Sequence, residues 1–374
     1  MKFNVSSTML CNRLQTLSRV LASKNSLQIL DCILFELEDG HLRLTASDSE
    51  TTLVTTLDVN DADENGRFAI KANTIVSSLR EISEQPVSIE VNNQTHEIVI
   101  NYQNGKSNFV GQSADEYPVP QSIAEGVQQI TIDSAILLNG ISRALFATAD
   151  DQIHPVMNGV YFDVTTENLT FVASDGHKLV RDRNLKVHGD QPAAFILPKK
   201  PAKMLKDILS REGGDAVVRF DDRNAQISLE NYTLSCRLIE GRYPNYNSVI
   251  PQDNPYRITI DRAALLGALR RVLVFANVST SLVKLRIETN TLTVSAQDIS
   301  YATSAEEHVM CDYGGTAMSI GFKGTFLIDI LSSIASDEVV LELADPSRAG
   351  VIVPSQQEEG EDLLMLLMPM MLNE

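Results

Sequence analysis

The 374-residue chain contains the same short pattern three times, and this repetition limits its possible folds more than any other feature. In each copy, apolar residues at alternate positions lead into an aspartate, as expected of a half-buried strand that ends in a turn. The copies span residues 42–48, 169–175 and 292–298, so the aspartates lie 127 and 123 residues apart. This period is too long for a solenoid unit, so each copy is expected to be a domain.

A second landmark repeats with the same period. Tyr-Pro or Met-Pro pairs stand at 117–118, 243–244 and 368–369, at intervals of 126 and 125 residues. Each third also opens with a short strand pattern followed by apolar residues at helical spacing. The sequence therefore predicts an α+β fold of three repeated domains, each with two helices backed by antiparallel sheets. The predicted domains are 1–125, 126–253 and 254–374.

Positive charge collects on the predicted helices, which span 8–24, 71–82, 133–149, 198–211, 261–277 and 323–335. These ranges hold 15 basic and 5 acidic residues, although the whole chain has a net charge of −18. Lys and Arg are also good helix formers on solvated faces. Their recurrence on equivalent helices of an acidic chain nevertheless favours one basic surface, which suits a phosphate backbone contacted without reading sequence.

Few features indicate catalysis. Residues 174–177 place Ser, Asp and His side by side, but neighbouring side chains at a strand end diverge, whereas a catalytic triad converges in space. The chain has no Walker A loop, GxGxxG turn, GxSxG elbow or HExxH helix. Its six histidines are dispersed and its four cysteines lack CxxC spacing. We therefore predict no catalytic residue, metal or cofactor, and keep a three-domain hydrolase using Asp175 and His177 as the alternative.

The two ends of the chain bear on its location and contacts. The first residues lack the apolar run of a signal peptide, and no stretch approaches 18 apolar residues, so a cytoplasmic protein with no membrane contact is expected. Near the other end, 363–367 is predicted to be the last buried strand. Residues 368–372 either fill the core or form a binding surface, because proline stops a strand and methionine suits adaptable surfaces. The acidic run 356–362 is predicted to be a solvated loop.

Taken together, the threefold unit, the basic helices, Asp175-Gly-His-Lys-Leu179, Gly241-Arg-Tyr-Pro244 and the Met-Pro-Met segment resemble the bacterial sliding clamps, the beta subunits of DNA polymerase III. The resemblance runs from Met1 to Leu372. It implies a head-to-tail homodimer whose six domains form a ring around duplex DNA. Twelve helices side by side at about 9 Å would enclose a hole of roughly 24 Å once a helix diameter of about 10 Å is subtracted.

The resemblance also implies partners and their binding sites. Besides double-stranded DNA, these partners are the DNA polymerase III alpha subunit, the clamp loader delta subunit, and other polymerases and repair proteins with short clamp-binding peptides. The implied location of this protein is the cytoplasm, in association with the nucleoid. The implied peptide pocket consists of Met157, Ser174, Gly176, His177, Lys178, Leu179, Pro244, Val249, Phe326, Met368, Pro369, Met370, Met371 and Leu372.

Two further surfaces follow. The DNA-facing residues are Lys24 and Arg80 by resemblance, and Lys199, Lys200 and Lys203 by their place on a predicted helix. The residues that match the family's dimer seam are Phe109, Val274 and Phe275.

Some positions depart from the family pattern. Lys178 stands where arginine is usual, so bidentate hydrogen bonding to a partner is lost there. Ser248 and Met371 occupy positions that are often basic, and Phe326 one that is often tyrosine. Residues 155–156 align with an aromatic pair that contacts DNA, and we assign no DNA contact to Pro-Val there. We expect a preference for more apolar peptides.

Overall fold

The computed structural model describes residues 1–22, 27–118, 123 and 127–372. All six predicted helices are present, and each begins within one residue of its predicted start but ends two to six residues early. The helices are α1 (Ser7–Ser18), α2 (Ala72–Arg80), α3 (Ser134–Leu145), α4 (Lys199–Leu209), α5 (Arg262–Leu273) and α6 (Gly324–Ser333). The predicted boundary at residue 125 falls outside the described residues.

The predicted helices were too long because apolar side chains stay buried after the helix has ended. Beyond α1 the backbone tightens, so that the amides of Arg19 and Val20 donate to the carbonyls of Thr16 and Leu17, three residues back. Val20 is still fully buried. The apolar spacing therefore continues past the helix and overstates its length.

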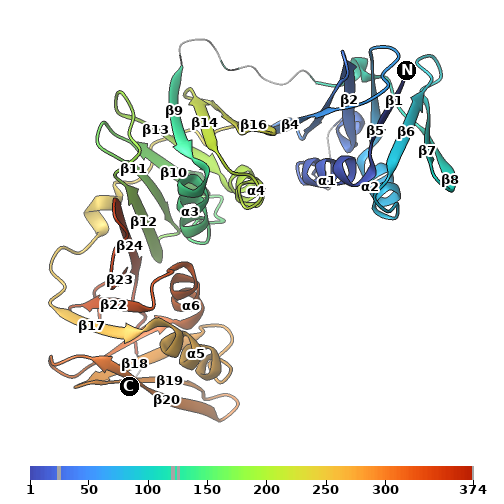
Figure 1. The fold of residues 1–374 in the computed structure, drawn as a ribbon. Coiled ribbons are helices and arrows are strands. Elements are labelled where there is room, and N and C mark those ends of the chain that lie inside the picture. The colour runs from blue at the N-terminus through green and yellow to red at the C-terminus, as the bar shows by residue number, and fades with distance from the viewer. Residues whose placement is uncertain (23–26, 119–122, 124–126, 373–374) are drawn as a thin grey trace. The chain divides into compact units, whose positions relative to one another are not determined.

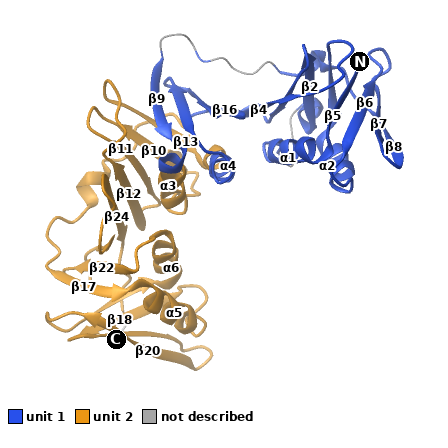
Figure 2. Ribbon diagram, viewed as in Figure 1, with its two compact units in different colours: residues 1–137, 203–238 blue, residues 138–202, 239–374 orange. Residues whose placement is uncertain are grey.

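The elements form two compact units, shown in separate colours in Figure 2. Unit 1 comprises Met1–Leu137 and Lys203–Leu238. It contains one sheet in the order β1-β6-β7-β8 and another in the order β5-β2-β3-β4-β16-β15-β14-β9. Its strands are β1 (Lys2–Ser6), β2 (Cys32–Glu38), β3 (His41–Ser47), β4 (Thr51–Asp58), β5 (Gly66–Lys71), β6 (Pro86–Val91), β7 (Glu97–Tyr102), β8 (Gly105–Val110), β9 (Gln128–Asp133), β14 (Asp215–Phe220), β15 (Asn224–Ser228) and β16 (Tyr232–Arg237). Short 3-10 helices span Gln28–Asp31 and Ala114–Glu116.

Within unit 1, the longer sheet joins strands from the first two repeats. β4 pairs antiparallel with β16, with Thr55 opposite Tyr232. Helices α1 and α2 pack side by side (Figure 1). Leu10, Leu14 and Leu17 of α1 are fully buried, so the predicted apolar stripe of this helix faces the core.

Unit 2 comprises Leu138–Ala202 and Ile239–Glu374. It is built on one twelve-stranded sheet in the order β13-β10-β11-β12-β24-β23-β22-β17-β20-β19-β18-β21. Its strands are β10 (Gly159–Val164), β11 (Leu169–Ser174), β12 (Lys178–Asn184), β13 (Ala193–Pro198), β17 (Tyr256–Asp261), β18 (Leu282–Glu288), β19 (Thr291–Asp298), β20 (Thr303–Asp312), β21 (Met318–Lys323), β22 (Glu338–Leu343), β23 (Gly350–Pro354) and β24 (Glu361–Leu367). Short 3-10 helices span Pro155–Met157 and Tyr246–Val249. The α+β class with antiparallel sheets is confirmed.

The repeated aspartates have a structural role. Asp48, Asp175 and Asp298 each stand where a strand gives way to a turn before the next antiparallel strand. The Asp175 carboxylate accepts the amides of His177 and Lys178, both at 2.9 Å, and Asp48 and Asp298 accept amides in the same way. These side chains close hairpin turns, which explains why the pattern recurs in every third.

Part of the predicted basic and acidic surface is buried instead. The Arg143 guanidinium of α3 contacts Asp182 of β12 at 3.2 Å and Glu361 of β24 at 2.6 Å, and all three side chains are almost fully buried. Arg143 therefore does not contribute to a basic helical surface. The prediction of a solvated loop over 356–362 was wrong at its end, because Glu361 and Asp362 belong to β24 and form ion pairs with arginines.

This buried cluster predicts a pH dependence of stability. Burial raises the pKa of Asp182 to about 6, Arg143 opposes the rise, and Glu361 and Asp362 add to it. Because an unfolded aspartate has a pKa of about 3.9, the folded chain binds more protons between about pH 4 and 6. The free energy of unfolding should therefore fall as pH rises through this window, by roughly 2–3 kcal/mol from this group.

Asp182→Asn should remove this contribution. We expect the difference in unfolding free energy between variant and wild type to grow in favour of the variant from pH 4 to 6, measured by urea denaturation. Asp222→Asn, a change to an exposed aspartate, is the control. Equal pH profiles for Asp182→Asn and wild type would contradict the assignment.

Candidate functional site

The turn between β11 and β12 forms one side of the predicted peptide pocket. Gly176 adopts a φ of +84°, which favours glycine over residues with a Cβ atom. The Ser174 hydroxyl donates to the Lys178 carbonyl at 2.9 Å. The exposed Gly176 and His177 therefore lie on a turn whose backbone is held by its own side chains.

The segment after β24 is tied to this turn and to β21. The Met368 amide donates to the His177 carbonyl, and the Met370 amide to the Gly321 carbonyl, both at 2.8 Å. Gly321 admits this approach because a Cβ there would lie 2.7 Å from the Met370 oxygen. The structure thus brings the 174–179 and 368–372 groups of the predicted pocket together. Gly321 itself was missed, since no sequence motif marks it.

Lys178 and Leu179, which the resemblance placed in the pocket, have buried side chains. The Lys178 ammonium forms an ion pair with Asp175 and lies 3.8 Å from the centroid of the Phe326 ring. Burial pushes the pKa of Asp175 upward, but the Lys178 ammonium and the amides of Lys178 and His177 outweigh it, so the net shift is downward. The Lys323 ammonium lies 4.4 Å from the same ring. The buried Lys178 side chain therefore contacts the Phe326 ring from the interior of the fold.

Apart from Gly176 and His177, the exposed part of the predicted pocket is apolar. Val249 is 56% exposed and Met371 83% exposed, and Met368 and Pro244 are exposed as well. The remaining members are partly buried: Met157, Ser174, Phe326, Pro369, Met370 and Leu372.

A buried apolar cluster supports this surface. Tyr243, Tyr246 and Ile250 pack in one buried cluster with Leu179 of β12 and Leu366 of β24. Tyr246 and Ile250 flank Val249 closely in sequence, so the cluster holds Val249 on the side of the fold formed by β12 and β24. Large apolar side chains left exposed over a packed base are typical of a site for another molecule.

The hydrolase alternative is not supported by this geometry. The Asp175 carboxylate contacts the Lys178 ammonium and two backbone amides, rather than the His177 ring. Within the described residues, no group of three or more His, Cys, Asp or Glu could hold a metal ion. No helix of the described part is long and apolar enough to cross a membrane.

The predicted DNA-facing residues differ in their surroundings. Lys24 lies outside the described residues. Arg80 is exposed in the last turn of α2, and Lys203 is exposed on α4. On the same helix, Lys199 and Lys200 are partly buried, and the Lys199 ammonium lies 4.0 Å from the Asp150 carboxylate.

One edge of the four-stranded sheet in unit 1 is incompletely paired. Strand β8 is the last strand of the four-stranded sheet and pairs on one side with β7. Its Phe109 is partly buried and Val110 is exposed. Exposed sheet edges of this kind can pair with another chain.

Unit 2 has a corresponding edge. β20 pairs with β19 along most of its length but with β17 only at Thr259–Asp312 and Ile260–Cys311. Beside it, the residues after α5 include Val274, 78% exposed, and Phe275, 40% exposed. The Asn277 side chain donates to Asp298 at 3.1 Å and ties this segment to the β19–β20 turn. The neighbouring exposed apolar residues, which sequence analysis missed, are Val278, Ile299 and Tyr301.

Comparison with known proteins agrees with this architecture. Models of the DNA polymerase III beta subunit match residues 1–121 as the N-terminal domain, 131–245 as the central domain and 247–371 as the C-terminal domain. The beta sliding clamp of Haemophilus influenzae is 27% identical over 98% of this chain and 99% of its own. That of Pseudomonas aeruginosa is 24% identical over the full length of both.

Solved structures show the same fold. A Pseudomonas aeruginosa sliding clamp bound to griselimycin superposes with a TM-score of 0.93 at 23% identity, over the whole of both chains. A DNA polymerase III beta subunit from Thermotoga maritima gives a TM-score of 0.90 at 25% identity, again over both whole chains. Because the three domain models match almost the whole sequence in order, the chain belongs to the DNA polymerase III beta subunit family, the bacterial sliding clamps.

Proposed function

We propose that this sliding clamp acts as a head-to-tail homodimer, whose ring encircles duplex DNA and holds replication proteins on it. As a member of this family it is a non-catalytic processivity factor. The observation that carries the proposal is the pair of incomplete sheet edges, at β8 and at β20. Because the two edges differ, one edge of a chain can pair with the other edge of a second copy, and two such contacts close a ring.

The residues at these edges support head-to-tail pairing. Phe109 and Val110 on β8 would meet Val274 and Phe275 beside β20, which removes apolar surface from water at both contacts. Lys106 of β8 and Glu306 of β20 are exposed and opposite in sign. The domain bounds 1–125, 126–253 and 254–374 are part of this proposal, since they give the ring six repeated units.

The apolar surface around Val249, Met368 and Met371 is proposed to bind short peptide segments of partner proteins. We infer that these partners include the DNA polymerase III alpha subunit, the clamp loader delta subunit, and other polymerases and repair proteins, which compete for one site. Sliding clamps of Pseudomonas aeruginosa and Bartonella birtlesii have been crystallised with griselimycin bound. We propose that griselimycin binds this chain at the apolar surface around Val249, Met368 and Met371. The protein then works in the cytoplasm on the nucleoid.

The basic residues Lys24, Arg80, Lys199, Lys200 and Lys203 are proposed to face the enclosed DNA. Phosphate contacts of this kind carry no sequence information and are weakened by salt, which allows sliding. The function is tested by comparing binding to linear duplex DNA with free ends and with blocked ends, because a ring can thread only onto the former.

A further inference from the structure

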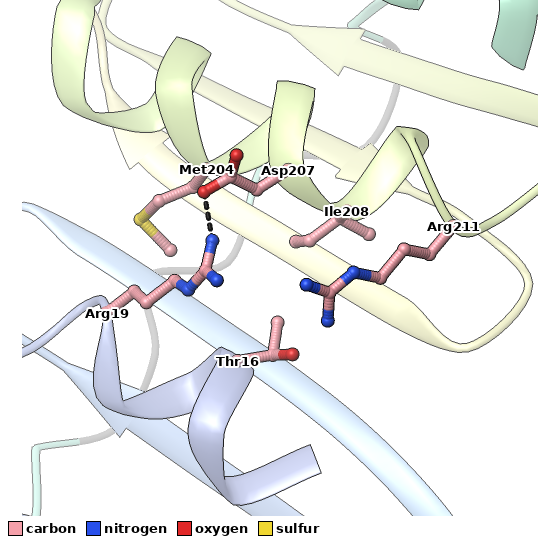
Figure 3. Close-up of a pocket in the computed structure, with 6 residues that line it drawn as sticks. All are labelled: Thr16, Arg19, Met204, Asp207, Ile208 and Arg211. Carbon is pink, nitrogen blue, oxygen red and sulfur yellow. Dashed lines mark hydrogen bonds and ion pairs between the residues drawn. The ribbon is translucent and has the colours of Figure 1, made fainter. Parts of the chain in front are cut away.

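A cleft between α1 and α4, together with a smaller pocket beside it, is lined by three arginines in different surroundings. The cavity has a volume of about 280 Å³, and all its lining residues belong to unit 1. Arg13 of α1 lines it together with Arg211, which follows α4. Arg19, the residue after α1, and Arg211 also line a smaller adjoining pocket, shown in Figure 3.

Arg13 is fixed in the structure. Its guanidinium lies 3.5 Å from the Glu212 carboxylate and 4.7 Å from the centroid of the Tyr232 ring. Glu212 in turn accepts the Asn231 side-chain amide at 2.6 Å. Both members of the Arg13–Glu212 pair are mostly buried. Arg13 therefore joins the two sides of the cleft and is not free to bind another molecule.

Arg19 and Arg211 are more available. Arg19 forms an ion pair with Asp207 of α4, but the two side chains are 45% and 52% exposed. Solvent screens such a pair, so it is easily displaced. Arg211 is exposed, and within the described residues no side-chain partner is found for its guanidinium. Figure 3 shows the Arg19 and Arg211 guanidinium groups extending into one space beside Asp207.

The positive charge at and beside this cleft favours binding of a polyanion. Lys203 and Lys206 are exposed on α4, the helix that carries Asp207 and leads to Arg211, whereas the whole chain carries a net charge of −18. A single small anion would need only one of these groups. A phosphate backbone can use the cleft and the lysines in succession.

We propose that the α1–α4 cleft binds a DNA phosphodiester, which Arg211 contacts directly and Arg19 joins when the phosphate displaces Asp207. This inference rests on the proposed function. A guanidinium can bind carboxylate or phosphate in the same bidentate manner, so Asp207 and the phosphate compete for Arg19. Asp207 thereby lowers the affinity of the clamp for DNA and favours sliding.

The test measures binding of the dimer to a short fluorescein-labelled duplex with free ends, by anisotropy, between about 50 and 200 mM salt. Arg211→Ala should weaken binding about threefold to tenfold and lower the salt slope by about 1. Asp207→Asn should tighten binding by a similar factor and raise the slope, because Arg19 is released to phosphate. Arg211→Lys should restore part of the binding, since it keeps the charge.

Controls with the same changes of charge lie on the β14–β15 turn, at the exposed Asp222 and Arg223. If Asp207→Asn behaves like Asp222→Asn, the competition is overturned. If Arg211→Ala behaves like Arg223→Ala, the direct contact is overturned. Wild-type protein that binds free-ended and end-blocked duplexes equally would instead refute the proposed ring function. Inorganic phosphate that competes no better than chloride at equal ionic strength supports the backbone of DNA as the ligand, whereas stronger competition points to a free-phosphate site.

Discussion

Replacing Val274 and Phe275 together by aspartate should halve the solution mass of the protein, from a dimer to the single 41.2 kDa chain. Both side chains are exposed beside β20, on the edge that we propose pairs with β8 of a second copy. Aspartate there would place unpaired carboxylates in an apolar contact, at a cost of about 1–3 kcal/mol each. A ring contains two such contacts, so the dimer should weaken by at least about a thousandfold.

Light scattering at micromolar protein measures this effect. The matched control is Ile153→Asp with Leu185→Asp, which also adds two carboxylates at exposed apolar positions of unit 2 but away from the edge. The control should keep a mass of about twice 41.2 kDa. A Val274/Phe275 variant that remains dimeric at the lowest concentration measured would show that the contact lies elsewhere.

The second large effect concerns the peptide surface. Val249→Asp should weaken griselimycin binding by about thirtyfold or more, because the ligand would have to desolvate a new carboxylate at a cost of about 2 kcal/mol or more. Isothermal titration calorimetry measures the dissociation constant. The variant should keep the wild-type fold, because Val249 is 56% exposed and the residues beneath it, Tyr246 and Ile250, are unchanged.

Leu185→Asp is the control for this experiment, since Leu185 is 52% exposed in the same unit and lies outside the proposed surface. It should bind griselimycin as the wild type does. Met371→Asp tests the C-terminal part of the surface, where Met371 is 83% exposed, and should also weaken binding. Unchanged affinity in both Val249→Asp and Met371→Asp would contradict the assignment of the site.

Features that depend on nearby residues were predictable from the sequence. The turns after Asp48, Asp175 and Asp298 were anticipated because an aspartate closes a turn with amides only two or three residues away. The start of α5 lies within one residue of its prediction, and Asp261 accepts the Ala264 amide there at 2.6 Å, again a contact three residues along the chain. The last strand was also anticipated, because Leu363–Leu367 are too apolar to remain in solvent.

Features that depend on distant residues were not. From the sequence, Arg143 was counted among the surface charges. In the structure, β12 and β24 place Asp182 and Glu361 against it, and the three side chains are buried together. Lys178 matched a partner-contacting position of the family, yet the distant Phe326 ring, together with the neighbouring Asp175, holds it inside the fold. In each case a partner from another part of the chain decides whether a charge reaches the surface, and neither spacing nor resemblance contains that information.

The most direct test of the ring is binding to a linear duplex whose two ends are either free or blocked by biotin–streptavidin. A closed dimer reaches linear DNA by threading over an end, so blocking both ends should abolish the binding seen with free ends at the same salt concentration. The monomeric Val274/Phe275 variant should show no such difference. Equal binding of the wild-type protein to free-ended and end-blocked duplexes would contradict encirclement and leave only surface contact with the phosphate backbone.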